Sequence, residues 1–297
     1  MGEPGGPNRA ITARGLMLRE RSFRPASAAL SRTMALVRGR PHSWVSRRNG
    51  RIIGLADAGQ RAGPHSWEVS SLSLRDGDED CLPDLLARAS YAAASAGAAR
   101  VFLRLRPDDH LADAARSAGF YTCFSELLYE GSPPPAIGPR TEVLPSLREA
   151  EPRDDYDLFR LYTAATPLEV RAAVGMGFDH WTSSHERRPS RCREFVIIED
   201  EAVRGWVSAT RGSATGLLEA TVHPDHERGI GAMVDFGLES LIRAKAVLCL
   251  VPEYQIALSR ALAERGFEPV SEYEMLVKSI AKTAKDEVST RTTARST

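Results

Sequence analysis

The order of elements expected from this 297-residue sequence occurs twice, at a nearly constant offset. Gly54 and Gly205, each in the second strand of an expected hairpin, lie 151 positions apart, and the Gly119-Phe120 and Gly266-Phe267 pairs lie 147 positions apart. The triplet Leu18-Arg19-Glu20 also recurs, as Leu147-Arg148-Glu149. Because self-similarity at a fixed period indicates repeated units of one fold, we expect two copies of a single α/β unit.

Each copy contains a predicted hairpin, followed later by a strand and a helix. The first hairpin spans residues 44–55 around Arg48-Asn49-Gly50, and Asn-Gly is the favoured sequence of a tight turn. The second has strands at 194–198 and 202–209 with a turn at 199–201. A strand at 101–105 and a helix from about Asp109 to Gly119 are repeated by a strand at 247–251 and a helix from about Gln255 to Gly266.

Proline and polar residues mark the boundaries of the copies. Residues 131–144 include Pro133-Pro134-Pro135 and Pro139, and proline lacks the N–H that a helix or central strand requires. We therefore predict domains at 14–130 and 145–280, joined by a linker at 131–144. Residues 1–13 and 281–297 show no apolar periodicity, so disordered ends are expected there.

Composition excludes several classes of protein. Lys plus Arg and Asp plus Glu both number 39, so no net positive charge favours a nucleic-acid partner. No apolar stretch approaches the roughly 18 residues that span a bilayer, and no signal peptide is recognisable, so no membrane partner is expected. The four cysteines have neither metal-ligand nor disulfide-framework spacing. A cytoplasmic location and reduced thiols are expected.

In the second copy, a predicted strand at 216–222 leads through a glycine turn into a predicted helix. Apolar residues from Ile230 to Ile242 follow helical spacing. The backbone N–H groups at the start of such a helix are unsatisfied and attract an anion. Gly229 and Gly231 carry no side chain that would keep a phosphate away from the main chain, and Arg228 adds a cation. A tight turn without a ligand is the alternative.

A strand therefore leads into a helix through a V-x-P-x-x-x-x-G-x-G motif that begins at Val222, and a strand, a helix ending in Gly-Phe and a final strand follow. This arrangement resembles the GNAT superfamily of acetyl-CoA-dependent acetyltransferases. The resemblance covers both copies, with the motif only in the second. It implies an α/β (α+β) fold of two tandem domains, each with a mixed, mostly antiparallel central sheet flanked by helices. It also implies acetyl-CoA as co-substrate, with no metal.

The resemblance also implies which residues contact the cofactor. Where the family has Arg or Gln at the head of the glycine motif, this sequence has His226, and Gln255 stands where the family often has an asparagine beside the pantetheine arm. The full predicted set is Thr221, Val222, His226, Arg228, Gly229, Ile230, Gly231, Ala232 and Gln255.

The first copy lacks these features. Its corresponding segment, residues 73–83, has one glycine and four acidic residues, Asp76, Asp78, Glu79 and Asp80. Like charges disfavour diphosphate binding there. A degenerate copy, retained for packing or to shape the substrate cleft, is expected.

Candidates for catalysis lie on and near the strand before the loop. Strand alternation places Glu219, Thr221 and His223 on one face, and Glu219 is a candidate general base or an ordinary half-exposed strand residue. Many members of the family have a tyrosine four residues before the final Gly-Phe pair, but here that residue is Leu262. Tyr254 is the candidate replacement that would protonate the leaving thiolate, with a structural role as its alternative.

Residues in the region that varies between the copies are more ambiguous. His180 and His185 flank Trp181 and indicate either a cleft wall or a solvated surface.

The resulting prediction is an N-acetyltransferase that transfers an acetyl group directly from acetyl-CoA to a primary amine of a small molecule or peptide. The alternative is a non-catalytic CoA or acyl-CoA sensor or interaction protein. Tandem copies with an inactive first half also resemble the organisation of mycothiol synthase, an analogy that identifies no substrate. Either a monomer or a homodimer fits the sequence.

Overall fold

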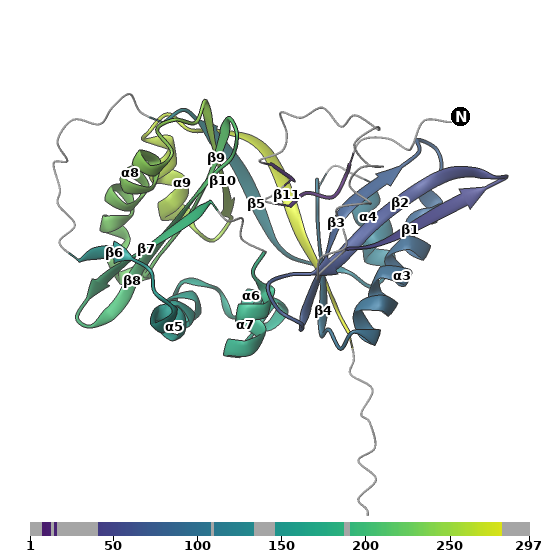
Figure 1. Ribbon diagram of the computed structural model, residues 1–297, viewed down its shortest axis with the longest axis horizontal. Helices are drawn as coiled ribbons and strands as arrows, with labels where there is room; N and C mark the ends of the chain where they lie inside the picture. The colour runs from purple at the N-terminus through teal and green to yellow at the C-terminus, as the bar shows by residue number, and fades with distance from the viewer. Residues whose placement is uncertain are drawn as a thin grey trace, which may run out of the picture.

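The computed structural model of the chain describes residues 8–12, 15–16, 41–107, 110–133, 146–186 and 191–280. Within these residues the strands form one sheet of eleven, in the order β1-β2-β3-β4-β11-β5-β10-β9-β8-β7-β6, with helices packed on it (Figure 1). Most neighbouring strands are antiparallel, and two pairs are parallel. The predicted α/β class with a mixed, mostly antiparallel sheet is confirmed, although the two halves share one sheet.

The first half, in chain order, consists of β1 His42–Arg48, β2 Arg51–Gln60, β3 Ser66–Leu74, a 3-10 turn Glu79–Cys81, α3 Leu82–Ser95, β4 Arg100–Leu105, α4 Leu111–Ser117 and β5 Tyr121–Gly131. The second half consists of β6 Leu147–Glu149, a 3-10 turn Pro152–Asp154, α5 Asp155–Ala165, α6 Leu168–Val174, α7 Phe178–Ser184, β7 Cys192–Glu199, β8 Ala202–Arg211, β9 Thr215–Val222, a 3-10 segment Pro224–Gly229, α8 Ile230–Ser240, β10 Ala246–Pro252, α9 Ile256–Ala263 and β11 Glu268–Ser279.

Both predicted hairpins are confirmed, and their turns share one backbone geometry. Asn49 and Gly50 between β1 and β2 have φ of 52° and 75°, and Asp200 and Glu201 between β7 and β8 have φ of 49° and 58°. Two successive positive φ values are typical of the tight turn whose twist matches that of the flanking strands.

The equivalent glycines explain how the repeat packs. A Cβ on Gly54 would lie 2.7 Å from Cys81 Sγ, and a Cβ on Gly205 would overlap Met233. Each glycine lies in the second strand of its hairpin, β2 or β8, and lets a later segment approach that strand closely. This segment leads into α3 in the first half and forms α8 in the second. The offset of 151 residues reflects this shared packing requirement.

The two halves exchange their last strands. β5, the last strand of the first half, pairs with β10, and β11, the last strand of the second half, pairs with β4. β5 and β11 also pair with each other at the centre of the sheet. The predicted domain limits, 14–130 and 145–280, therefore do not separate two sheets in space, because a strand of each half completes the sheet of the other.

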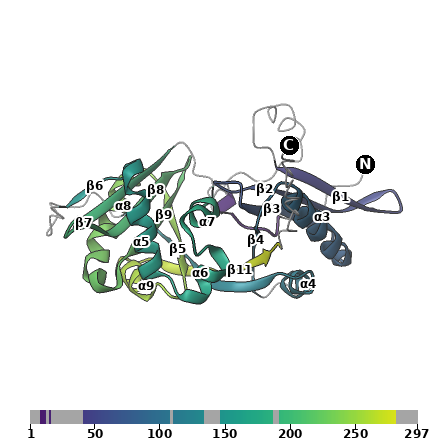
Figure 2. The same ribbon diagram turned by 90° about the horizontal axis from the view of Figure 1, so that it is seen from below.

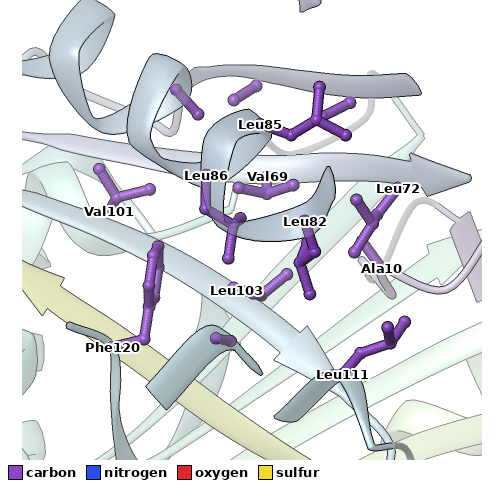
Figure 3. Packing of buried hydrophobic residues seen from close by; sticks show 14 of the residues in the cluster. Ala10, Val69, Leu72, Leu82, Leu85, Leu86, Val101, Leu103, Leu111 and Phe120 are labelled. Atoms are coloured by element: carbon purple, nitrogen blue, oxygen red, sulfur yellow. The ribbon is translucent and has the colours of Figure 1, made fainter. Parts of the chain in front are cut away.

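Each half has its own hydrophobic core. In the first, Leu82, Leu85 and Leu86 of α3 pack on Val69 and Leu103 of the sheet (Figure 3). In the second, α8 and α9 pack on the face of β8 and β9 that carries Val207 and Leu218.

Helices α5, α6 and α7 lie close to the junction of the halves, below the sheet in Figure 1 and in front of it in Figure 2. Leu161 of α5 packs on Val196 and Val203, whereas Phe195 and Ile197, the neighbours of Val196 on β7, face the α8 core. Because successive strand residues point to opposite faces, α5 and α8 cover opposite faces of the sheet.

The N-terminal residues differ from the prediction. Disorder was expected over 1–13, but residues 8–12 pack against the first half, where Ala10 and Thr12 are buried. Residues 1–7, the linker from 134, the triplet Leu18-Arg19-Glu20 and the tail 281–297 lie outside the described residues. None of the helices in the described part of the chain is both long and apolar enough to cross a bilayer.

Candidate active site

The second half contains an opening between two parallel strands. β9 and β10 pair only at Thr215–Leu217 and Ala246–Leu248, and the remaining residues of the two strands pair with β8 and β5 instead. The strands therefore diverge toward their C-terminal ends. In α/β folds, ligands commonly bind beyond the carboxyl ends of parallel strands.

A cavity of about 780 Å³ lies at this opening. Its walls come from β9 and β10, from helices α5, α6 and α7, and from the central strands β4, β5 and β11. Both halves contribute, because strand exchange brings β4 and β5 to the same place. The volume is within the range of roughly 300–1,000 Å³ that small-molecule sites occupy.

The two predicted catalytic residues, Glu219 and Tyr254, both line this cavity, and they come from opposite sides of the opening. Glu219 lies on β9, and its carboxylate is near enough to Cys249 of β10 to add to the effect of burial in raising the pKa of that thiol. Burial also raises the pKa of Tyr254, whose side chain hydrogen-bonds that of Thr166. A tyrosine is protonated at neutral pH without such a shift, and burial makes the Tyr254 phenol a weaker acid.

The other predicted residues divide between the cavity and the loop. Thr221 and Gln255 line the cavity beside the catalytic candidates. Val222 packs on the α8 core, opposite to Glu219, as strand alternation predicts. Leu262 is fully buried in that core and presents no proton donor at the family's tyrosine position.

The loop after β9 forms a short 3-10 segment that continues directly into α8. His223 Nδ1 accepts a hydrogen bond from the Asp225 N–H at 3.2 Å and so caps this segment. His226 Nδ1 lies 2.8 Å from Glu199 Oε2 of β7, which gives His226 a structural partner. The Ile230 N–H, at the start of α8, donates to the Glu227 carbonyl.

The two glycines of the loop have different environments. A Cβ on Gly229 would meet nothing within 4 Å, whereas a Cβ on Gly231 would lie 2.9 Å from Arg265 Nη2. The guanidinium of Arg265, the end of a flexible side chain, therefore occupies the space beside Gly231 in this structure. Arg265 forms a two-pronged pair with Asp235 at 2.5 and 2.8 Å, and it places a cation beside the first turn of α8.

Sequence reasoning did not identify Arg265, although it directly precedes the Gly266-Phe267 pair. The structure distinguishes the two predicted roles of the histidines that flank Trp181, a cleft wall or a solvated surface. Trp181 and His185 line the cavity, with ring centroids 4.6 Å apart, so they form a cleft wall. His180 contacts His65 of the first half instead.

A network of charged side chains lies where the halves meet. Arg104 Nε is 2.6 Å from Glu126 Oε2, and Arg104 Nη1 is 2.8 Å from Glu186 Oε1. Arg61 pairs with Glu68 at 3.1 Å and with Glu186 at 3.5 Å. Three carboxylates thus share two guanidinium groups. One sequence signal was available, because Arg104 interrupts the apolar run that begins at Val101 in the strand Arg100–Leu105.

Glu68 gives this network a pH dependence. Burial and the nearby Glu186 carboxylate raise the pKa of Glu68 to about 7 from its usual 4.5, against the opposing effect of Arg61. The folded protein thus holds this proton more tightly than the unfolded chain. The associated stability is fully present below about pH 4.5 and is lost as the pH rises through 7.

Between pH 5 and 8, we expect the wild-type protein to lose on the order of 2 kcal/mol relative to Glu68→Gln. Urea denaturation at several pH values measures this difference, with exposed Glu272→Gln as the control. Parallel pH profiles for wild type and Glu68→Gln would contradict the assignment.

Among the described residues, no group of three or more His, Cys, Asp or Glu side chains is arranged to hold a metal ion.

Neither a protein-family model nor a curated protein matches this sequence. Solved structures do resemble the fold. A GCN5-related N-acetyltransferase from Sphaerobacter thermophilus is 16% identical with a TM-score of 0.55, over 92% of this chain and 95% of that chain. A tandem GNAT protein from the clavulanic acid biosynthesis pathway is 17% identical, with a TM-score of 0.48 over 81% and 83% of the two chains.

A GCN5-related N-acetyltransferase from Kribbella flavida is 15% identical, with a TM-score of 0.49 over 87% of this chain and 97% of that chain. The match to the Sphaerobacter thermophilus protein extends over both halves. Over nearly its whole length, the chain has the fold of a GNAT, or GCN5-related, N-acetyltransferase.

Proposed function

We propose that this protein is an N-acetyltransferase that transfers an acetyl group directly from acetyl-CoA to a primary amine. The observation that carries the proposal is the placement of Glu219 and Tyr254 on opposite sides of one cavity, at the opening between β9 and β10. One group can accept a proton and the other can donate one. Transfer of an acetyl group to an amine requires both functions.

The residues of the opening fit acetyl-CoA as co-substrate. The cavity is large enough for a thioester and an acceptor side by side. Residues of β9 line it, and the chain continues from the end of β9 into the loop that contains Gly229. The open space at Gly229, at the start of α8, suits the close approach of a diphosphate to the main chain. We assign Thr221, Val222 and Gln255 to the pantetheine arm, and the loop residues His226, Arg228, Gly229, Ile230, Gly231 and Ala232 to the diphosphate.

The chemistry assigned to the protein is two proton transfers. Acetyl-CoA supplies an activated acyl group as a thioester. Glu219 takes one proton from the bound ammonium group, which frees the nitrogen lone pair to attack the acetyl carbon. The nitrogen loses its second proton to solvent as the amide forms. Tyr254 gives a proton to the sulfur when the carbon–sulfur bond breaks, and bulk solvent later restores both groups.

Charge supports a cationic acceptor. The described residues that line the cavity include the four carboxylates of Glu126, Asp155, Glu186 and Glu219, but only two guanidinium groups, and Glu68 and the lining carboxylates pair with both of these. The excess negative charge stabilises an ammonium group and repels a free carboxylate. Small amines without a carboxylate are therefore the acceptors that we expect to react fastest.

A thiol-release assay with a panel of amines tests the proposal. The panel contains a diamine, an aromatic amine, an amino acid and a short peptide, and mass spectrometry of each product locates the acetyl group. Amine-dependent CoA release with an N-acetylated product supports acetyl transfer. Tight acetyl-CoA binding without turnover on any member favours the sensor alternative, for which the buried Leu262 at the tyrosine position is the supporting observation.

Gly229→Glu is expected to weaken acetyl-CoA binding by roughly 30-fold, or about 2 kcal/mol. The substitution adds a negative charge at the start of α8, in open space, so the fold has room for it. Isothermal titration of the whole chain measures the change and should give one site per chain. The halves cannot be titrated separately, because each contains a strand of the other's sheet.

Gly177→Glu is the matched control for this titration. Gly177 also precedes a helix, α7, and a Cβ there also meets nothing within 4 Å. Unchanged affinity in Gly229→Glu, or an equal loss in both variants, would contradict the assignment of the loop to the cofactor.

A further inference from the structure

The first half has its own opening, at the position equivalent to the proposed cofactor opening. β3 and β4 pair in parallel only at Ser66–Glu68 and Arg100–Phe102, just as β9 and β10 pair over three residues and then diverge. The comparison with a cofactor opening rests on the proposed function, whereas the geometry of β3 and β4 does not.

Residues 8–12 of the chain lie in this first opening and hydrogen-bond to both of its strands. The Arg9 N–H donates to the Leu72 carbonyl of β3 at 2.7 Å, and the Leu72 N–H donates to Asn8 Oδ1 at 2.7 Å. On the other side, the Ile11 N–H donates to the Arg104 carbonyl of β4 at 3.1 Å. The segment therefore satisfies main-chain groups that the divergence of the strands leaves without a partner strand.

Side chains reinforce this docking. Ala10 is 1% exposed and belongs to the core beneath the opening, beside Leu72, Leu82 and Leu111 (Figure 3). The position is filled by a methyl group, so it accepts only a small apolar side chain. Asn8 Oδ1 also accepts the Ala10 N–H at 3.2 Å, which helps to hold the segment in one conformation.

The segment also reaches the cavity wall and the second half. The Ile11 carbonyl accepts a hydrogen bond from Arg104 Nη1 at 3.2 Å, and the same Nη1 contacts Glu186. Leu16 is 1% exposed and packs with Leu217 and Leu248, the last paired residues before β9 and β10 diverge. One short stretch thus closes the first opening and lies at the base of the second.

We propose that the opening between β3 and β4 is a binding site for a peptide, and that residues 8–12 of this chain are the peptide that occupies it. Occupancy by this segment keeps other ligands out of the first half. The acidic residues of that half do not account for this alone, because Arg48 pairs with Asp78 and Asp80 at 2.7 and 2.6 Å. The recognised features are an Asn side chain, a small apolar residue two positions later, and main-chain N–H groups that donate to both strands.

Hydrogen exchange of the Leu72 amide tests the docking in the full chain. Ala10→Glu places a charge in a buried pocket, and we expect release of the segment to accelerate exchange of this amide by about tenfold or more, with little change in the hairpin of β7 and β8. Ala94→Glu adds the same charge at an exposed position of α3 and should leave the Leu72 amide unchanged.

A second experiment tests whether the opening binds a separate peptide. A chain without residues 1–12 receives a synthetic peptide of residues 6–16, and binding should slow exchange at Leu72 again, whereas the same peptide carrying Ala10→Glu should not. An unchanged Leu72 amide in full-length Ala10→Glu, or no protection by the wild-type peptide, would overturn the proposal. Because neither arm uses acetyl-CoA, both outcomes are independent of whether the protein transfers acetyl groups.

Discussion

Replacing Arg104 with methionine is expected to lower the free energy of unfolding at pH 7 by about 3 to 5 kcal/mol. Arg104 is 6% exposed, and its guanidinium contacts the 5% exposed Glu126 at 2.6 Å and Glu186 at 2.8 Å. Methionine fills much of the volume but leaves Glu126 buried without its cation. Removing one partner of a buried pair exposes the full desolvation cost of the other. Urea denaturation measures the loss.

Two further variants separate charge from packing. In Arg104→Met/Glu126→Gln the orphaned charge is absent, so we expect part of the lost stability to return. Arg88→Met removes an exposed arginine that pairs with Asp84 one helical turn away, at 2.9 Å, and this should cost less than about 0.5 kcal/mol. Equal losses for Arg104→Met and Arg88→Met would show that burial of the network contributes little.

The parts of the fold that follow from local chemistry could be predicted from the sequence. Asn49-Gly50 specifies a tight turn whatever its surroundings, and Gly54 and Gly205 recur because each half needs a segment close to the second strand of its hairpin. The apolar spacing after Ile230 likewise requires a helix with one buried face. Such patterns depend on residues that are near in sequence, so they can be recognised without knowing which strand pairs with which.

The exchange of β5 and β11 could not be predicted in this way. Each of these strands is long and directly follows a Gly-Phe pair. By its sequence, either strand could join the sheet of its own half or that of the other half. Strand pattern specifies which face is buried, and the choice of neighbour is made by tertiary packing. Arg104 and Glu126 show the consequence, because their ion pair at the junction brings together β4 and β5 across the inserted β11.

The candidate site shows the same division. Strand alternation along β9 placed Glu219 in the cavity and Val222 on the opposite side. The docking of residues 8–12 could not be predicted in this way, because it depends on single contacts, such as those of Asn8 and Ala10, that form no periodic pattern. The contact between Gly231 and Arg265 was not predicted, because the two residues are distant in sequence.

The proposed base, Glu219, is tested by a substitution that removes only its ability to accept a proton. Glu219→Gln is expected to lower kcat by about 100-fold or more, within the usual range for removal of a general base, with little change in the affinity for acetyl-CoA. Glutamine keeps the shape and polarity of the side chain on β9 but does not accept a proton from an ammonium group. Steady-state rates with the fastest acceptor of the amine panel, together with isothermal titration of acetyl-CoA, measure the two effects separately.

Asp155→Asn is the matched control, because Asp155 also lines the cavity but lies on α5, on its exposed side. Both substitutions remove one negative charge from the cavity, so a purely electrostatic effect on a cationic amine would raise KM in both variants. Loss of a base lowers kcat in Glu219→Gln alone and also removes the increase in rate with pH that ionisation of the base produces. Equal kcat values in the two variants, with the same pH profile as wild type, would therefore assign both carboxylates to attraction of the amine and exclude Glu219 from proton transfer.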